Sequence, residues 1–281
     1  MVGGPRGGGA GAIVAVALLF ALPAAADGGI ARIRAQGQLT VAIFNEDVPP
    51  FFYLDAGRLA GIDPWLSGDI AAKLGVALRF DRAARTFDAL VDEVAEGRAD
   101  IAVSLLSDTL DRAMKVQFSA PYVEVRQFLL INRLKLGSLG RGRPADTPVP
   151  AILDAPAARI GVIAGTSYVG FLAEDFPAAE KVEFDQWSDM LEAVKAGELA
   201  ALMYDEIEIG NWRLADPAGA LTLRPYLLEG RPDTIAIAIR REDDDLKDWV
   251  DLYLEKLRNN GELDALLKRY LYTSERALTD E

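Results

Sequence analysis

An amphipathic helix that leads into a short apolar strand occurs twice in this chain, with the same internal spacing. The first copy has an apolar helix face, a glycine stop and a strand: Phe87, Leu90, Val91, Val94, Gly97 and Ile101-Ala102-Val103. The second copy lies 100 positions later: Trp187, Met190, Leu191, Val194, Gly197 and Ala201-Leu202-Met203. Alternating strands and amphipathic helices indicate an α/β fold. The repeat favours a duplication, or two lobes of shared architecture, over chance.

The rest of the chain continues this alternation. We expect strands at residues 39–43, 101–106, 159–163 and 234–239. Asp63 is a candidate N-cap, with Pro64 at the first helical position and Gly75 at the end of the helix, and Thr86 is the candidate N-cap of the next one. Amphipathic helices should cover residues 243–272, with a break at 259–261.

A change of composition separates the two copies. Residues 133–150 are rich in glycine, proline and basic side chains, which is typical of a surface loop. We expect a solvated connector there rather than a docking patch. The strand at 159–163 should then open the second lobe.

Two absences from the composition remove whole classes of chemistry. The 281 residues include no Cys and no His, so thiol nucleophiles, disulfides, the commonest metal ligand and the common general base at neutral pH are all missing. We therefore expect no metal, no cofactor and no catalytic residues, with a carboxylate or lysine enzyme as the alternative. The net charge of −13 argues against nucleic acid, because neutralising phosphates requires a basic face.

The N-terminus has the layout of a secretory signal peptide. Arg6 precedes an apolar run from Ala12 to Leu22, and Ala24-Ala25-Ala26 follows Pro23. A basic start, an apolar stretch of about 7–15 residues and an A-x-A ending mark a cleaved signal. The alternative, an anchor helix, needs about 20 apolar residues. We expect cleavage near Ala26 and, without a Cys to carry a lipid, a mature chain that is free in the periplasm.

Polar residues follow the predicted strands, at the edge where open α/β sheets bind ligands. The candidate ligand contacts are Asn45 after the first strand, Ser104, Leu105, Ser107 and Arg112 after the second, Thr166 and Ser167 after the third, and Asp205 after the strand that begins at Ala201. Phe87 is a candidate apolar wall, although its place on a helix face suits the core equally well.

Together these groups fit an amino acid. A guanidinium such as that of Arg112 binds a carboxylate through two parallel hydrogen bonds, and the free N–H groups at the helix start near Thr166 and Ser167 favour an anion. Asp205 suits an ammonium, together with hydroxyl and carbonyl acceptors that follow the second strand. Because the groups that suit the carboxylate and those that suit the ammonium belong to different lobes, a ligand would close the cleft between the lobes.

Each of these residues also has a purely structural interpretation. Arg112 suits an exposed helix surface, and the serines after the second strand suit turns that need their hydroxyls. Thr166 or Ser167 suits an ordinary N-cap, and Asp205 suits the cap of the next helix. Their joint position at strand ends favours ligand binding.

Several motifs along residues 38–271 stand in an order that resembles a known family. They are Val48-Pro49-Pro50-Phe51, Gly61-Ile62-Asp63, 70–75, 107–112 with 118–122, 162–167 and 257–270. The family is that of the bacterial periplasmic solute-binding proteins of the polar amino-acid type, the third family of extracellular solute-binding proteins. The resemblance depends on the motifs together, since no single one is specific.

The resemblance implies a periplasmic binding protein-like type II fold. In this α/β architecture two αβ lobes are joined by two hinge strands, and the ligand cleft lies between them. It places a signal peptide at 1–26, lobe 1 at 27–125 and 233–281, and lobe 2 at 126–232.

The resemblance also assigns roles by position. Arg112 would hold the ligand α-carboxylate, with Ser107 and the amides of Thr166 and Ser167, and Asp205 would hold the α-ammonium. In binders of basic amino acids an Asp stands where this chain has Asn45, which weakens a lysine or arginine interpretation. The pocket for the ligand side chain would be lined by Asn45, Phe87 and Ser104.

We therefore expect a non-enzymatic solute-binding protein that captures an amino acid or a similar small zwitterion. It would act as a monomer and deliver its ligand to the membrane permease of an ABC importer, with no nucleic-acid partner. One alternative is a periplasmic enzyme on the same scaffold, similar to cyclohexadienyl or prephenate dehydratases, with Glu206 or Glu46 as its acid. Another alternative is a sensory binding protein for a membrane or redox partner.

Overall fold

The computed structural model describes residues 1–4, 28–230 and 232–279. The predicted signal peptide, residues 1–26, lies outside the described residues apart from positions 1–4. Within the described part of the chain, no helix is both long enough and apolar enough to cross a membrane.

The first of two five-stranded sheets has the strand order β4-β1-β5-β14-β6. Its strands are β1 (Gln38–Ala42), β4 (Ala77–Asp81), β5 (Ile101–Ala102), β6 (Gln117–Phe118) and β14 (Ala238–Ile239). The helices around it are α1 (Gly29–Gln36), α2 (Ile62–Leu74), α3 (Phe87–Ala95), α4 (Leu110–Ala113), α10 (Asp244–Asn259) and α11 (Glu262–Thr279). A hairpin of β2 (Tyr53–Asp55) and β3 (Arg58–Ala60) precedes α2. We call this part lobe 1.

The second sheet has the order β10-β9-β11-β8-β12 and forms the centre of lobe 2. Its strands are β8 (Gln127–Asn132), β9 (Arg159–Ile163), β10 (Glu180–Phe184), β11 (Ala201–Asp205) and β12 (Leu223–Leu227). The helices of this lobe are α5 (Arg133–Leu139), α6 (Val149–Leu153), α7 (Tyr168–Asp175), α8 (Trp187–Ala196), α9 (Glu206–Ala215) and the 3₁₀ helix η1 (Pro217–Leu221).

The two sheets repeat one topology. In lobe 1, β1 lies between the parallel strands β4 and β5, and in lobe 2, β9 lies between the parallel strands β10 and β11. An antiparallel strand then follows in each sheet, β14 beside β5 and β8 beside β11. The repeated helix–strand units of the sequence are α3–β5 and α8–β11, so the predicted sharing of lobe architecture is confirmed.

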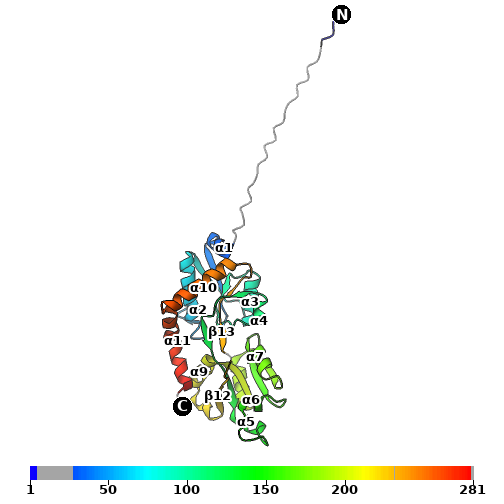
Figure 1. Cartoon of the computed structure of the whole chain (residues 1–281), viewed down its shortest axis with the longest axis vertical. Helices are drawn as coiled ribbons and strands as arrows, with labels where there is room; N and C mark the ends of the chain where they lie inside the picture. Colours follow the sequence, from blue (N-terminus) through cyan, green and yellow to red (C-terminus); the bar gives the residue numbers. More distant parts are fainter. Residues whose placement is uncertain (5–27, 231, 280–281) are drawn as a thin grey trace.

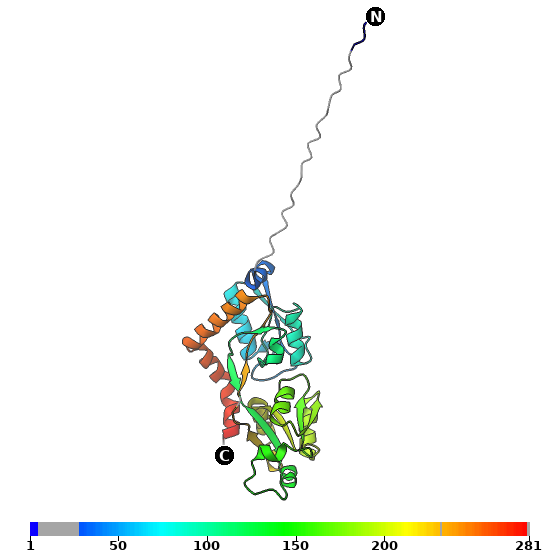
Figure 2. The ribbon, with the colours of Figure 1, turned by 45° about the vertical axis from the view of Figure 1, so that its right-hand side comes forward.

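Two short strands connect the lobes. β7 (Val123–Val125) and β13 (Asp233–Ile235) pair antiparallel and form a sheet of their own. Figures 1 and 2 show these strands between the upper part of the molecule, lobe 1, and the lower part, lobe 2. The prediction of one strand over 234–239 is wrong, because β13 pairs in the hinge while β14 pairs in the sheet of lobe 1. The lobe limits 27–125, 126–232 and 233–281 remain a proposal.

Three local predictions need correction. The strand expected at 101–106 ends at Ala102. Asp63 does not cap α2, because Gly61 occupies the N-cap position and Asp63 lies buried inside the first turn. There its carboxylate accepts hydrogen bonds from the Leu105 amide and the Tyr122 hydroxyl, each at 2.8 Å. The expected loop at 133–150 contains α5 and the start of α6, and the Asn132 side chain caps α5.

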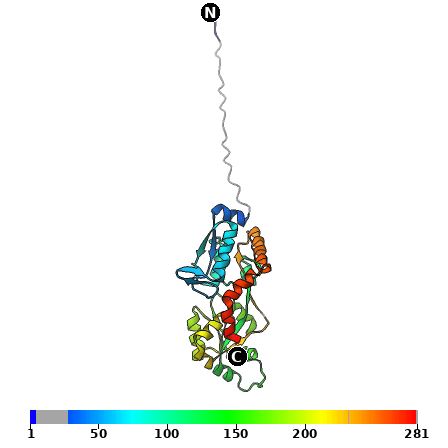
Figure 3. The ribbon, with the colours of Figure 1, turned by 90° about the vertical axis from the view of Figure 1, so that its left-hand side faces the viewer.

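Alternating residues of the lobe 2 strands enter two different cores. Leu129 and Ile131 of β8 pack into the cluster on one face of the sheet, and Leu130 packs into the cluster on the other face. Lobe 1 has one large core, and Ile207 from α9 of lobe 2 also packs into it. Helix α11 runs from lobe 1 toward lobe 2 and lies beside α9 (Figures 1 and 3).

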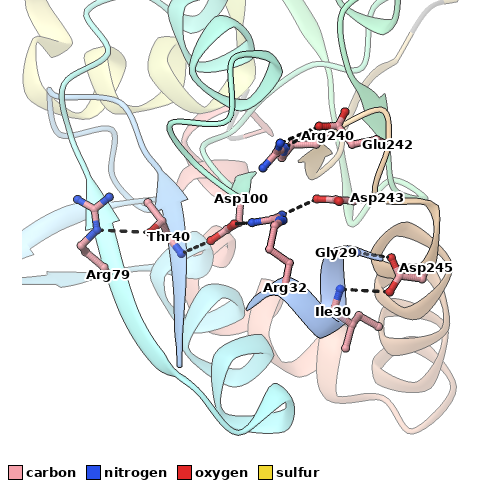
Figure 4. Close-up of polar contacts among 10 residues, drawn as sticks. All are labelled: Gly29, Ile30, Arg32, Thr40, Arg79, Asp100, Arg240, Glu242, Asp243 and Asp245. Carbon is pink, nitrogen blue, oxygen red and sulfur yellow. Dashed lines mark hydrogen bonds and ion pairs between the residues drawn. The ribbon is translucent and has the colours of Figure 1, made fainter. Parts of the chain in front are cut away.

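Helix α1 is tied to the C-terminal part of lobe 1 by polar contacts (Figure 4). The Gly29 and Ile30 amides donate to the Asp245 carboxylate at 2.7 and 3.1 Å. Arg32 pairs with Asp243 at 2.6 Å and also with Asp100, whose second oxygen accepts from the Thr40 amide of β1. One arginine therefore joins α1, the sheet and the start of α10.

Candidate ligand-binding site

A cavity lies between the lobes, and residues from both lobes and from the hinge line it. Seven of the residues singled out in the sequence are among them: Phe87, Leu105, Ser107, Arg112, Thr166, Ser167 and Asp205. Tyr168, Tyr204 and Asp233 also line it, together with apolar hinge residues. The space inside is about 20 Å³, room for about one water molecule. The structure is therefore a closed form of the cleft.

Arg112 is buried against the cavity and is not a surface residue of its helix. Thr109 caps α4, and the Arg112 side chain is only 6% exposed. Its Nη1 donates to the Ser107 carbonyl at 3.1 Å, and its Nε donates to Asp88 Oδ1 at 3.0 Å. These contacts hold the guanidinium in place, which is the arrangement that a carboxylate-binding arginine needs.

Ser107 makes the contact between the lobes at the centre of the site. Its Oγ lies 2.9 Å from Ser167 Oγ of lobe 2 and donates to Asp233 Oδ2 of the hinge at 2.9 Å. Asp233 was not among the predicted contacts, because the predicted strand begins at Thr234, whereas β13 begins at Asp233. The sequence contains a clue to its role: Asp233 precedes a largely apolar segment, and a charged side chain that is buried with such a segment needs a partner.

The turn that follows β9 fits closely against lobe 1. Gly165 has a left-handed φ of +69°, and a Cβ at this position would lie 2.7 Å from Thr86 Cβ. The Gly165 carbonyl accepts a hydrogen bond from the Asp88 amide at 3.1 Å. The Thr166 hydroxyl donates to the Ile163 carbonyl at 2.7 Å and so stabilises the turn itself. Only a glycine lets the two lobes approach this closely here.

Asp205 caps the next helix, as its structural interpretation expected, and it faces the cavity, as ligand binding would require. It is the N-cap of α9 and accepts a hydrogen bond from the Glu208 amide at 2.8 Å. It also lines the cavity and is buried. Burial raises the pKa of Asp205 to about 6, against the lowering effect of hydrogen bonds from the backbone.

Two of the predicted contacts do not line this cavity. Ser104 is buried, and its Oγ accepts a hydrogen bond from the Phe44 amide at 2.9 Å, so it supports the end of β1. Asn45 is exposed. Phe87 does line the cavity and stacks on Phe44 with ring centroids 4.8 Å apart, so it also belongs to the core of lobe 1.

Aromatic side chains form the lobe 2 wall of the cavity. Tyr168 stacks on Tyr204 with ring centroids 5.1 Å apart, and Trp187 contacts Tyr204 in a tilted arrangement with ring centroids 5.2 Å apart. The Tyr168 hydroxyl is buried and has no hydrogen-bond partner among the described residues. A buried hydroxyl without a partner is costly, so Tyr168 is a further candidate for ligand contact. Tyr168 was not among the predicted contacts, because only Thr166 and Ser167 of this turn were assigned to the ligand.

Carboxyl groups outnumber cations in the lining. Of the residues that line the cavity, Arg112 carries the positive charge, and Asp205 and Asp233 are the acids. Burial raises the pKa of Asp233 to about 7, against the lowering effect of the hydrogen bond from Ser107. Glu206 and Glu46, the candidate acids of the enzyme alternative, do not line this cavity: Glu206 pairs with Arg126, and Glu46 is exposed.

Two αβ lobes that close over a cavity with a buried arginine on one side and a buried aspartate on the other define a two-lobed binding protein. The fold is the periplasmic binding protein-like type II fold, as predicted. The chain belongs to the bacterial extracellular solute-binding proteins, family 3, whose family model matches residues 24–273.

Similar proteins agree with this assignment. A probable histidine-binding protein of Neisseria gonorrhoeae is 26% identical, with 89% of this chain and 86% of that protein covered. A solved solute receptor for L-cysteine from Neisseria gonorrhoeae is 25% identical, with a TM-score of 0.69 and with 86% of this chain and 93% of that one covered. A membrane-bound lytic murein transglycosylase F of Pseudomonas fluorescens is 26% identical over 85% of this chain, but the match spans only 47% of that longer protein.

Proposed function

We propose that this protein captures an amino acid or a closely similar zwitterion, reversibly and without covalent chemistry. The observation that carries the proposal is the placement of Arg112 and Asp205, which face one cavity from different lobes. Relatives named as histidine-binding, arginine-binding and L-cystine-binding proteins support an amino acid as the ligand.

The ligand α-carboxylate would lie against the Arg112 guanidinium. Ser107 and Ser167 meet across the cleft at 2.9 Å, and the cavity has room for about one water molecule, so the lobes would have to move apart before an oxygen of the ligand could enter between these two side chains. Charge-assisted hydrogen bonds of this kind are shorter and stronger than neutral ones.

The ligand α-ammonium would lie against Asp205. The Asp205 carboxylate is fixed by the start of α9, so it needs little reorganisation to accept the ligand. The Tyr168 hydroxyl, which has no partner among the described residues, would complete this side of the site. Because Arg112 and Asp205 belong to different lobes, a ligand that has both a carboxylate and an ammonium would link the lobes and favour their closure.

The ligand would pass to the permease of an ABC importer, with the protein acting as a monomer in the periplasm after cleavage near Ala26. The family's description as extracellular supports an exported chain. The lobes would open about the β7–β13 hinge to release the ligand, which is the hinge motion expected of two domains joined by short strands.

A thermal-shift screen of the purified protein tests this function. The compounds are the twenty common amino acids, opines, polyamines, and small keto and dicarboxylic acids. A ligand at about a hundredfold excess over its Kd raises the unfolding free energy by about 2.7 kcal/mol. We expect a clear shift with a zwitterion. Shifts only with acids that lack an amine, or turnover of cyclohexadienyl acids, would contradict the proposal.

A further inference from the structure

Asp233 is the acid in the cavity that the proposed function leaves without a role. It enters the site on hinge strand β13, is 4% exposed, and contacts Ser107 Oγ through its Oδ2 at 2.9 Å. Ser107 is also a residue expected to donate to the ligand carboxylate. Two carboxyl groups, one from the protein and one from the ligand, would therefore compete for the hydrogen of the Ser107 hydroxyl.

A serine hydroxyl has only one hydrogen to donate. While Asp233 is ionised, that hydrogen points to Asp233 Oδ2, and Ser107 offers a ligand carboxylate only its lone pairs. Once Asp233 is protonated, it can donate to Ser107 Oγ, and Ser107 can turn its own hydrogen toward the ligand. Ser167 Oγ, 2.9 Å from Ser107 Oγ, completes the chain of hydroxyls.

The charges in the site also favour a protonated Asp233 when a ligand carboxylate is bound. A ligand carboxylate at Arg112 would lie one hydroxyl group away from Asp233, in a site closed to solvent. Two ionised carboxylates that share a buried site disfavour each other, and one of them takes up a proton. Arg112 carries a single positive charge and also pairs with Asp88 at 3.0 Å, so it does not balance two further ionised carboxylates.

We propose that Asp233 is a specificity-determining residue that must take up a proton before the cleft can hold the ligand carboxylate, so that capture of each amino acid binds one proton. This inference rests on the proposed function, because it concerns how the same site accepts an amino acid.

The groups around Asp233 suit this role. Lobe 1 presents Arg112 and Asp108, lobe 2 presents Asp205 and the Tyr168 hydroxyl, and the facing residue of the other hinge strand is the apolar Val125. Burial is the main cause that raises the pKa of Asp233 to about 7, and the negative charges of Asp205 and Asp108 add to it. The group is therefore poised to change its protonation near neutral pH.

The test measures affinity against pH. The probes are the twenty common L-amino acids, each tested singly by calorimetry with wild-type protein between pH 6.0 and 8.5. For those that bind, we expect Kd to rise about tenfold per pH unit above the pKa of Asp233. Titrations at pH 8 in buffers of different ionisation enthalpy should show uptake of about one proton.

The decisive variant is Asp233→Asn, whose amide donates to Ser107 at every pH. We expect its Kd to be independent of pH and at least about tenfold lower than that of the wild type at pH 8.5. Asp108→Asn is the control: it removes the neighbouring carboxyl group, which accepts a hydrogen bond from Thr234. It should keep the rise of Kd by about tenfold per pH unit, with the rise starting at a slightly lower pH because Asp108 helps to raise the pKa of Asp233.

Other outcomes would overturn the proposal. If an amino acid binds the wild type equally well at pH 6.0 and 8.5 without proton uptake, this inference fails while the proposed function stands. If Asp233→Asn weakens binding at every pH, Asp233 is ionised in the complex and binds a second cationic group of the ligand. If none of the twenty amino acids binds at any pH, the proposed function fails and the inference fails with it.

Discussion

At the scale of single residues, Arg112 is the side chain that we expect to contribute most to binding a carboxylate ligand. Its guanidinium is buried, is oriented by Asp88 and by the Ser107 carbonyl, and faces the cavity. Hydrogen bonds to charged groups contribute about 1.5–3 kcal/mol each. One side chain can therefore decide whether a carboxylate ligand is retained.

Arg112→Ala should raise the Kd for an amino acid by at least about tenfold. Calorimetry measures the change, and circular dichroism shows whether the variant remains folded. Arg141→Ala, which removes an exposed arginine of lobe 2 far from the cavity, is the control and should bind as the wild type does. Unchanged affinity in Arg112→Ala would show that Arg112 does not bind the ligand.

Arg32, which does not line the cavity, stabilises the fold of lobe 1. Its partners Asp100 and Asp243 are 7% and 5% exposed, so Arg32→Ala would leave two nearly buried carboxylates without their cation. We expect a loss of about 3 kcal/mol in the free energy of unfolding. Urea denaturation measures it, and Arg79→Ala, at an exposed arginine shown in the same view (Figure 4), should cost less than about 1 kcal/mol.

The sequence placed Arg112, Ser107 and Asp205 among the candidate contacts because open sheets bind ligands beyond the ends of their strands, and all three line the cavity. Ser107 and Arg112 follow the end of β5 at Ala102, and Asp205 is the last residue of β11. Asp233 and Tyr168 were missed, since one belongs to a hinge strand and the other follows the Gly165 turn by three residues. Whether a side chain after a strand turns into the cleft depends on the backbone path, which residue type does not reveal. Asn45 shows this, because it follows β1 and yet is exposed.

At the scale of elements, the turn between β9 and α7 decides how closely the lobes can approach. Gly165 has no side chain, and this lets Thr86 of lobe 1 pack against its backbone. The same turn delivers Ser167 to Ser107. The turn is therefore part of the closed form as well as a connection within lobe 2.

Gly165→Ala should weaken ligand binding by about tenfold or more, because the added methyl group would meet Thr86 Cβ at 2.7 Å and because φ is +69°. The affinity of an amino acid measures the effect. Gly170→Ala is the control in α7, where a Cβ would meet nothing within 4 Å, and it should bind normally. Equal affinity in both variants would mean that closure does not bring Gly165 against Thr86.

Elements with strong local signals were predicted well. The strand Arg159–Ile163 and the cap of α3 by Thr86 appear as expected, and the break between the last helices falls at 260–261. The strands predicted at 101–106 and 234–239 are longer than the observed ones. Strand pairing depends on distant partners, which an apolar run does not specify. Residues 133–150 were assigned to a loop from their glycines, although packing and the Asn132 cap stabilise helix there.

At the scale of the whole molecule, several buried or half-buried carboxyl groups have raised pKa values. Burial is the main cause that raises the pKa to about 7 for Asp63, Glu208 and Asp233, and to about 6 for Asp205. In the unfolded chain these groups titrate near pH 4. Between these values the folded state binds more protons than the unfolded state, so their contribution to stability is complete below about pH 4 and is lost as the pH rises to about 7.

The ligand-free protein should therefore become less stable between pH 5 and pH 8. Each such group contributes a slope of at most about 1.4 kcal/mol per pH unit. Urea denaturation across this range measures the trend, and Glu208→Gln should make it shallower, whereas Glu229→Gln, at an exposed position, should not. A stability that rises from pH 5 to pH 8 would contradict the assignment of protons to these buried groups.

The central claim is that one cleft recognises a carboxylate with lobe 1 and an ammonium with lobe 2. The most direct test compares the best-binding amino acid with its decarboxylated amine and its deaminated acid, using calorimetry on the wild-type protein at pH 6. The account predicts that each analogue binds at least about tenfold more weakly, because it leaves Arg112 or Asp205 without a partner. If the acid without an ammonium binds as tightly as the amino acid, Asp205 does not hold the ligand and the account is wrong.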